Sequence, residues 1–263
     1  MEIRIVQCKT AASRSRLPGL DWAVNPYRGC AHGCSYCYAQ DVTRFELGRP
    51  WGEVCEVKAN IVEVLKKELS RGARGVYGIG TVTDPYQPVE ERHQLTRGCL
   101  AALKQKGASV SVLTKSPLVL RDLDLLGGWA GAEVGVSIGS MDADVARVIE
   151  PGAPGPERRF EALRALSDAG VEVYLMAAPI VPGLSDADGM LKMLVAEARA
   201  ANVKRIMWDM YNPRPAAVAR MHKALMAAGL EPLQHAGPSD VVRVREVLTS
   251  ACAEKGIELV SAF

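Results

Sequence analysis

The sequence predicts an α/β protein: a partial TIM-like barrel of six β/α units followed by a short helical C-terminal extension. The first observation is that apolar stretches of strand length alternate with amphipathic stretches of helix length from about residue 58 to residue 210. Successive β-then-α units of this kind build a parallel sheet. The second is that five or six such units are too few for a closed eight-unit barrel. A doubly wound open sheet is the alternative, and it places its site at the same sheet edge.

The individual elements follow from periodicity and from stop signals. A helix is expected at 58–71, because Ile61, Val64, Leu65 and Leu69 share one face and Gly72 follows. Further helices are expected at 38–47, 90–106, 117–126, 142–150 and 157–169, and one from a cap at Ser185 or Asp186 to Ala201. Strands are expected at 3–6, 75–80, 109–114, 132–138, 171–178, 204–210 and 257–260.

The same pattern suggests three parts of the chain. Residues 1–21 form a basic N-terminal lead-in, and residues 22–212 form the barrel core. Residues 213–263 form a C-terminal helical extension packed on that core. At 263 residues the chain is long enough for one large α/β domain with a sizeable core.

Composition and charge narrow the class of protein. Lys and Arg number 32 against 30 Asp and Glu, so the net charge of +2 neither demands nor excludes a nucleic-acid partner. The sequence has no apolar run of about 18 residues, so no membrane association is expected. Seven cysteines without a secretory signal pattern favour a cytoplasmic protein with free or metal-bound thiols.

Three of those cysteines, Cys30, Cys34 and Cys37, lie on one short stretch in a C-x-x-x-C-x-x-C spacing. Thiolates on one loop can converge on a metal centre, and sulfur ligands select iron–sulfur clusters, zinc or Cu(I). Both zinc sites and cubane clusters normally take four protein ligands. Three thiolates on a four-iron cluster leave one iron open for a substrate or cofactor. A structural zinc site and ordinary buried thiols are the alternatives, and we interpret His32 as a solvent-facing loop residue rather than a ligand.

Polar residues at the predicted strand ends are further candidates for the site that contains the three cysteines. Asp84, Lys115, Ser137 and Asp209 each follow or end an apolar strand. The carboxyl ends of parallel strands meet at one edge of a barrel, where active sites collect. We therefore expect these four residues near the cysteine loop. The alternative is that each is tied to a helix cap or a surface ion pair.

Several separate motifs now support a resemblance. The cysteine spacing followed by an aromatic residue resembles the cluster loop of the radical S-adenosylmethionine (SAM) enzymes. Motifs in the same order across about residues 22–215 resemble the spore photoproduct lyase-like branch of that family, and they are NPYRGC (25–30), TDPYQPVE (83–90), LTK (113–115), VSI (136–138), EPGAP (150–154) with Arg158 and Arg159, and APIVPG (178–183).

The resemblance implies cofactors and roles. Cys30, Cys34 and Cys37 would hold a 4Fe–4S cluster whose open iron binds SAM. Tyr36 would pack beside the adenine, and Asp84, Lys115, Ser137 and the backbone of Ala178 would complete the SAM site. It also implies an external one-electron reductant, flavodoxin- or ferredoxin-like, and a nucleic-acid base or nucleotide as substrate.

The sequence departs from that branch at one position. Its lyases carry a cysteine three residues before an Asp, which returns a hydrogen atom to the product radical, and Thr81 stands there instead. A threonine O–H bond is too strong for that transfer. The catalytic candidates are thus Thr81, by position, and Tyr38 as a substitute donor, with Cys55 and Cys99 as further substitutes.

Three hypotheses remain from the sequence. The first is a radical SAM enzyme that abstracts hydrogen from its substrate. The second is a non-catalytic iron–sulfur or zinc protein with a redox or structural role. The third is a DNA photoproduct lyase with a non-standard hydrogen donor.

Overall fold

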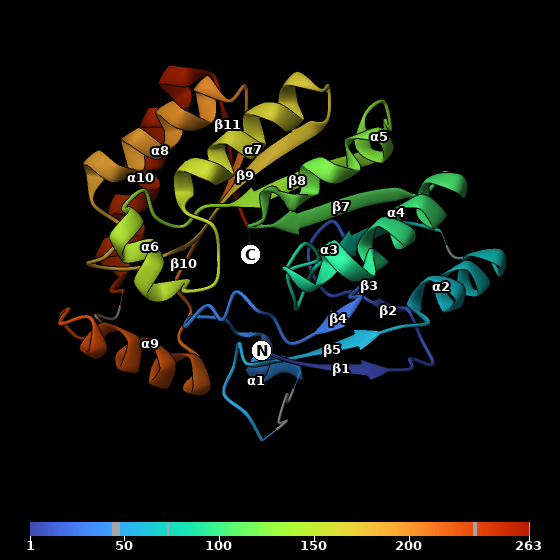
Figure 1. Cartoon of the computed structure of the whole chain (residues 1–263). Coiled ribbons are helices and arrows are strands. Elements are labelled where there is room, and N and C mark those ends of the chain that lie inside the picture. The colour runs from blue at the N-terminus through green and yellow to red at the C-terminus, as the bar shows by residue number, and fades with distance from the viewer. Residues whose placement is uncertain (44–47, 73, 234–235, 263) are drawn as a thin grey trace.

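The structure is a computed structural model that describes residues 1–43, 48–72, 74–233 and 236–262. Within these residues, eight strands form one twisted sheet in the order β11-β10-β9-β8-β7-β6-β3-β2 (Figure 1). All neighbouring pairs are parallel except β2 and β3. The strands are β2 (Ala12–Arg14), β3 (Trp22–Val24), β6 (Val76–Ile79), β7 (Ser109–Thr114), β8 (Ala132–Ser137), β9 (Glu172–Ile180), β10 (Arg205–Met210) and β11 (Glu258–Ser261). The predicted α/β class with a partial, TIM-like parallel barrel is therefore confirmed.

A second, smaller sheet lies beside the open barrel. The described part of it consists of β1 (Glu2–Val6), β5 (Val54–Lys58) and β4 (Tyr27–Arg28), with β5 in the centre. β1 and β5 are parallel, whereas β4 runs antiparallel to β5. Because β4 directly precedes the three cysteines, this sheet anchors the start of the cysteine loop.

Helices cover the outer face of the large sheet (Figure 1). The described helices are α1 (Ala39–Thr43), α2 (Ile61–Ser70), α3 (Val89–His93), α4 (Leu95–Gln105), the 3₁₀ helix η1 (Pro117–Asp122), α5 (Leu123–Leu126), α6 (Ala143–Ile149), α7 (Pro156–Asp168), α8 (Asp188–Ala200), α9 (Pro215–Ala227) and α10 (Pro238–Lys255). None of these helices is long and apolar enough to cross a membrane.

Alternation along the strands divides the barrel into a packed outside and a hollow inside. Val110 and Val112 of β7, and Val134 and Val136 of β8, are buried in the main apolar core with the helices. The intervening residues, such as Ser111, line the interior cavity. Because successive strand side chains point to opposite faces, one hydrophobic face builds the core and the other is free to build a site.

One predicted helix, 90–106, is wrong as a single element, because the chain breaks at Gln94 into α3 and α4. Gln94 has a left-handed backbone with φ of 52°. The buried Glu90 carboxylate accepts hydrogen bonds from the amides of Thr96 (3.0 Å) and Arg97 (3.3 Å). Those amides belong to the first turn of α4, so the Glu90 side chain accepts the hydrogen bonds that an N-cap residue normally accepts.

The predicted cap of the helix at 188–200 is also wrong. Ser185 and Asp186 lie before α8, whose N-terminal flanking residue is Ala187. The Ser185 hydroxyl accepts from the Val181 amide (2.9 Å) and the Asp186 carboxylate from the Gly183 amide (2.7 Å). Their side chains therefore close the loop after β9 instead of capping the helix.

The C-terminal segment 213–263 contains α9, α10 and β11. The strand β11 pairs in parallel with β10, so the chain's end extends the main sheet. The predicted helix at 38–47 is present as α1, and positions 44–47 lie outside the described residues.

Candidate functional site

The cysteine loop follows β3 and β4 at the carboxyl end of the sheet. Gly29 and Gly33 adopt left-handed backbones, with φ of 85° and 59°. The Gly33 amide donates to the Cys30 carbonyl (3.2 Å) and the Cys37 amide to the Cys34 carbonyl (3.1 Å). The two glycines supply the positive φ on either side of the first turn, and the two consecutive turns place all three cysteines along one cavity.

Buried polar groups fix the first half of this loop. The Gln87 side chain, which is fully buried, accepts from the Ala31 amide (2.9 Å) and donates to the Gly29 carbonyl (3.1 Å). The Thr83 hydroxyl donates to the same carbonyl (2.7 Å). The TDPYQPVE motif therefore holds the loop through its side chains.

A second backbone segment supports the middle of the loop. The Gly152 amide donates to the His32 carbonyl at 2.9 Å. A Cβ at position 152 would lie 2.3 Å from the Ala31 carbonyl oxygen. The EPGAP motif thus needs its glycine because the two backbones touch.

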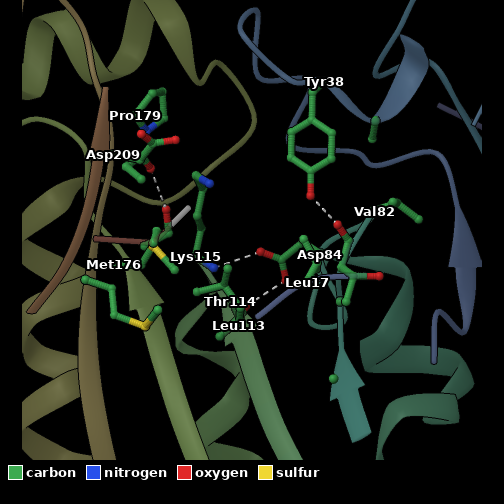
Figure 2. Close-up of a pocket in the computed structure, with 18 of the residues that line it drawn as sticks. Leu17, Tyr38, Val82, Asp84, Leu113, Thr114, Lys115, Met176, Pro179 and Asp209 are labelled. Atoms are coloured by element: carbon green, nitrogen blue, oxygen red, sulfur yellow. Dashed lines mark hydrogen bonds between the residues drawn. The ribbon is translucent and has the colours of Figure 1, made fainter. Parts of the chain in front are cut away.

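The cavity beside the cysteines has a volume of about 810 Å³ and extends through the barrel interior. Its walls are the inward residues of β7 to β11, and Figure 2 shows Lys115 rising from the end of β7 between Asp209 and Pro179 on one side and Tyr38 and Val82 on the other. Pockets of 300 to roughly 1,000 Å³ enclose ligands of cofactor size. The predicted meeting of Asp84, Lys115, Ser137 and Asp209 around one space agrees with the lining.

A buried polar network stands behind the cavity wall. The Tyr36 hydroxyl and the Arg159 guanidinium both donate to the Glu150 carboxylate. Arg159, 2% exposed, also donates to the Ser137 carbonyl (3.0 Å) and the Pro154 carbonyl (2.6 Å). A buried charge pair with its remaining hydrogen bonds satisfied holds its partners rigidly, so this network fixes the ring of Tyr36 and the end of β8.

Lys115 brings a positive charge into this wall. Its Nζ lies 4.0 Å from a Glu150 carboxylate oxygen and 5.6 Å from the centroid of the Tyr36 ring. Burial alone would lower the pKa of Lys115, but the neighbouring Cys34 and Glu150 raise it. Burial would likewise raise the pKa of Glu150, which Arg159 and Lys115 lower. The site therefore contains an ammonium that is loosely paired and faces the cavity.

Asp84 ties two strand ends together. Its carboxylate accepts from the Thr114 hydroxyl (2.6 Å), the Lys115 amide (2.7 Å) and the Tyr86 amide (2.8 Å) (Figure 2). Burial would raise its pKa, but His32 and the hydrogen bonds from Thr114 and Lys115 hold the pKa at about 2. Asp84 lines the cavity, yet its oxygens already accept hydrogen bonds from neighbouring residues. Its geometry therefore suits a positioning role.

His32 is not the solvent-facing residue expected from the sequence. It is 2% exposed, and its Nδ1 lies 3.3 Å from an Asp84 carboxylate oxygen. The loop turns inward at this point because Gly152 supports the His32 carbonyl from behind. His32 thus lies between the cysteine loop and the barrel strands, and its Nδ1 makes no hydrogen bond within the described residues.

The remaining predicted residues also line the cavity. The Ser137 hydroxyl donates to the Ala178 carbonyl (3.2 Å), which joins the ends of β8 and β9. The Thr81 hydroxyl accepts from the side-chain amide of Asn25 (2.9 Å). Tyr38, 41% exposed, donates its hydroxyl to the Thr81 carbonyl (2.5 Å) at the cavity mouth (Figure 2). Cys55 and Cys99, by contrast, are buried in the main core.

The cysteines themselves are in a largely apolar setting. Burial raises the pKa of Cys30 and Cys37, and raises that of Cys34 to about 12 even though the Lys115 charge opposes the shift. A bound metal deprotonates a coordinating thiol outright. No three His, Cys, Asp or Glu side chains within the described residues are arranged to hold a single metal ion. A cubane cluster presents a separate iron to each thiolate, so its ligands need not share one point.

Sequence reasoning missed several residues that shape this site. Gln87, Glu150 and Arg159 lie in motifs that carried the resemblance, and this was the signal that could have found them. Arg220, which contacts the cysteine loop from α9, had no sequence signal because it lies about 180 residues away from its partners.

Comparison with known proteins now defines the class. The family model of the Radical SAM superfamily matches residues 24–194. The chain belongs to the radical SAM superfamily.

Relatives and solved structures agree with this assignment. The chain is 35% identical over 188 residues to the Uncharacterized protein MJ0683 of Methanocaldococcus jannaschii, which covers 72% of this chain and 71% of that one. It is 36% identical over 208 residues to the Uncharacterized protein Rv2578c of Mycobacterium tuberculosis, covering 74% of this chain and 61% of that protein.

Among solved structures, spore photoproduct lyase complexed with dinucleoside spore photoproduct has a TM-score of 0.73 at 15% identity, covering 99% of this chain and 82% of that one. Streptococcus suis SuiB bound to S-adenosylmethionine has a TM-score of 0.59 at 12% identity, covering 91% and 49%. At these identities the likeness shows the fold, which is thus shared with spore photoproduct lyase.

Proposed function

We propose that this protein is a radical SAM enzyme that cleaves SAM reductively and uses the resulting radical to abstract hydrogen from a nucleic-acid base or nucleotide. The observation that carries the proposal is the cysteine loop. Cys30, Cys34 and Cys37 line the same cavity as the Lys115 ammonium and the Ser137 hydroxyl. Three thiolates beside an enclosed space with a cation fit a cluster that keeps one iron for a second ligand.

The chemistry and the cavity are compatible. When bound, a 4Fe–4S cluster would supply the single electron that cleaves the sulfonium–C5′ bond of SAM, which would give methionine and a 5′-deoxyadenosyl radical able to take a hydrogen atom from the substrate. Cys30, Cys34 and Cys37 would hold the cluster. Gly152 supports the fit, because it lets the backing segment touch the backbone of the loop at Ala31 and His32 with no side chain between them.

The cavity wall would bind the charged end of SAM. The Lys115 ammonium lies 4.0 Å from the Glu150 carboxylate, so it can meet a carboxylate of SAM without breaking a tight pair. Ser137 offers a hydroxyl, and the Tyr36 ring, fixed by its bond to Glu150, offers a flat apolar face for the adenine. Ala178 lies at the same wall and presents its backbone.

Hydrogen return to the product is the step in which this chain departs from the lyases it resembles. Thr81 supplies no hydrogen atom that a carbon radical can take easily. We propose Tyr38 as the donor, because its phenol O–H is held at the Thr81 carbonyl at the cavity mouth. Cys55 and Cys99 lie in the core instead.

The substrate class is the least constrained part of the proposal. The solved structures of similar fold include one that is bound to a dinucleoside spore photoproduct and another, SuiB, that is bound to the precursor peptide SuiA. A nucleotide or base is our proposal because the sequence motifs are those of the lyase-like branch. The electron would come from a flavodoxin- or ferredoxin-like protein.

The cluster assignment is tested by iron content. We expect the anaerobically reconstituted protein to hold about four iron atoms per chain. Single changes of Cys30, Cys34 or Cys37 to Ala remove most of that iron, while Cys8→Ala, at a half-buried site away from the cavity, leaves it intact. Equal iron in the loop variants and the control would contradict the proposal and favour a protein without a cluster.

The SAM site is tested by affinity. Lys115→Gln keeps a hydrogen-bond donor on a side chain one atom shorter but removes the charge, and a hydrogen bond to a charged group contributes about 1.5–3 kcal/mol. We expect SAM to bind the cluster-loaded variant about tenfold to a hundredfold more weakly by calorimetry. A cluster-loaded wild type that does not bind SAM would instead support a structural or redox-sensing role.

A further inference from the structure

Arg220 contacts the cysteine loop from outside the part of the chain that matches the family. Its Nε donates to the Ser35 carbonyl at 3.2 Å and one terminal nitrogen donates to the Cys37 carbonyl at 2.5 Å. The other terminal nitrogen donates to the side-chain oxygen of Gln40. All three nitrogens of the guanidinium are thus directed at the loop and the helix α1 that follows it.

These contacts complete the support of the loop. Gln87 and Gly152 hold the carbonyls of its first half, at Gly29 and His32. The second half, which contains Cys37, presents its carbonyls to Arg220. Between residues 29 and 38 the loop consists of turns and irregular backbone, so side chains from other elements must fix its shape.

The helix α9 places Arg220 with little freedom. Ala217, Met221 and Leu225 are spaced by four residues and are fully buried, and the latter two pack with Ile149 of α6. The Ala216 amide at the start of α9 donates to the Asp41 carboxylate at 3.3 Å. The Arg220 cation also lies 5.8 Å from the centroid of the Trp51 ring, which packs on Cys30 and Cys37.

We propose that Arg220 is a positioning residue that holds the Cys37 half of the loop in the shape that receives the cluster. The inference rests on the proposed function for its cofactor, and on the hydrogen bonds above for its geometry. A planar guanidinium can serve three acceptors at once in a fixed fork, which one lysine ammonium on a flexible stem does not reproduce.

The test compares Arg220→Gln and Arg220→Lys with Arg147→Gln. Arg147 is an exposed arginine on α6 that pairs only with Asp144 in the described structure, so its loss controls for a missing surface charge. The first readout is alkylation of Cys37 in the full-length, cluster-free protein, followed peptide by peptide. The second is the rate of iron loss from the reconstituted protein in the presence of a chelator. The third is the change in the electron paramagnetic resonance spectrum of the reduced cluster on adding SAM.

We expect Arg220→Gln to raise the rates of Cys37 alkylation and of iron loss about tenfold, because two carbonyls lose their charged donor. Its spectrum should also respond to SAM less than the wild-type spectrum does. Arg220→Lys should give intermediate rates, and Arg147→Gln should match wild type. Rates in Arg220→Gln equal to those of Arg147→Gln would overturn the proposal.

The alkylation measurement separates this inference from the proposed function. If the wild type binds no iron, the proposed function fails, while the alkylation rates still decide whether Arg220 holds the loop. If Arg220→Gln does not fold, Arg220→Lys decides. A rate several-fold above wild type supports the proposal, and the wild-type rate overturns it.

Discussion

Gly152 gives the sharpest prediction about the site, because it lies where two backbone segments meet behind the cysteine loop. In Gly152→Ala the new Cβ would lie 2.3 Å from the Ala31 carbonyl oxygen and 3.0 Å from the His32 Cα. Ordinary contacts between such atoms are at about 3.5 Å. The loop and its backing segment must therefore separate by about 1 Å, and both are backbone, so neither can simply rotate away.

The magnitude follows from that overlap. Overpacking of this kind costs about 1–3 kcal/mol of the free energy of unfolding. A shift of about 1 Å in a catalytic loop can lower activity by about a hundredfold. We therefore expect Gly152→Ala to lower the free energy of unfolding of the cluster-free protein by about 1–3 kcal/mol. We expect the same change to lower the rate of SAM cleavage by about a hundredfold.

The assay is anaerobic urea unfolding together with SAM turnover, and Gly155→Ala is its matched control. Gly155 lies three residues further on, and a Cβ there would meet nothing within 4 Å. The control should therefore unfold at the wild-type urea concentration, within about 0.5 kcal/mol. If Gly152→Ala behaves like Gly155→Ala in both measurements, the claim that this glycine shapes the cysteine loop is refuted.

Three further predictions follow from individual side chains. Glu90→Gln should lower the free energy of unfolding, measured in urea, by about 3–5 kcal/mol, because the buried carboxylate accepts hydrogen bonds from Tyr27, Thr96 and Arg121. Glu91 is exposed, so Glu91→Gln should change this free energy little, and equal effects of the two variants would refute the burial argument. Tyr38→Phe should leave the free energy of unfolding within about 0.5 kcal/mol of wild type, because the ring is partly exposed, but it should slow the formation of product from the substrate radical. An unchanged rate of product formation, measured by chromatography, would exclude Tyr38 as the hydrogen donor. Thr81→Cys places a thiol where the lyases carry their hydrogen-donating cysteine, so it should raise the yield of repaired product from a dinucleotide photoproduct. No gain in yield, measured by mass spectrometry, would count against such a lesion as the substrate.

Sequence reasoning recovers the parts of this protein that depend on local patterns. Strand positions such as Ser109–Thr114 follow from apolar runs bounded by glycine and a charged residue. The edge at which Lys115 and Ser137 gather follows from the rule that parallel strands end together. Both are properties of neighbouring residues or of topology, which a sequence carries directly.

Contacts between distant segments are what the sequence does not carry. The break at Gln94 depends on the buried Glu90 capturing the next helix's amides, and helix periodicity continues across it. The burial of His32 depends on the Gly152 segment behind it. Arg220 reads as one more arginine on an amphipathic helix, and only the packing of α9 beside α1 and α6 brings it to the cysteine loop.

The most direct measurement is the formation of 5′-deoxyadenosine. The protein is reconstituted anaerobically with iron and sulfide, given SAM and dithionite, and compared with Cys34→Ala by liquid chromatography. We expect 5′-deoxyadenosine from the wild type and only background from the variant. A wild-type protein that holds its cluster yet neither binds nor cleaves SAM would contradict this expectation.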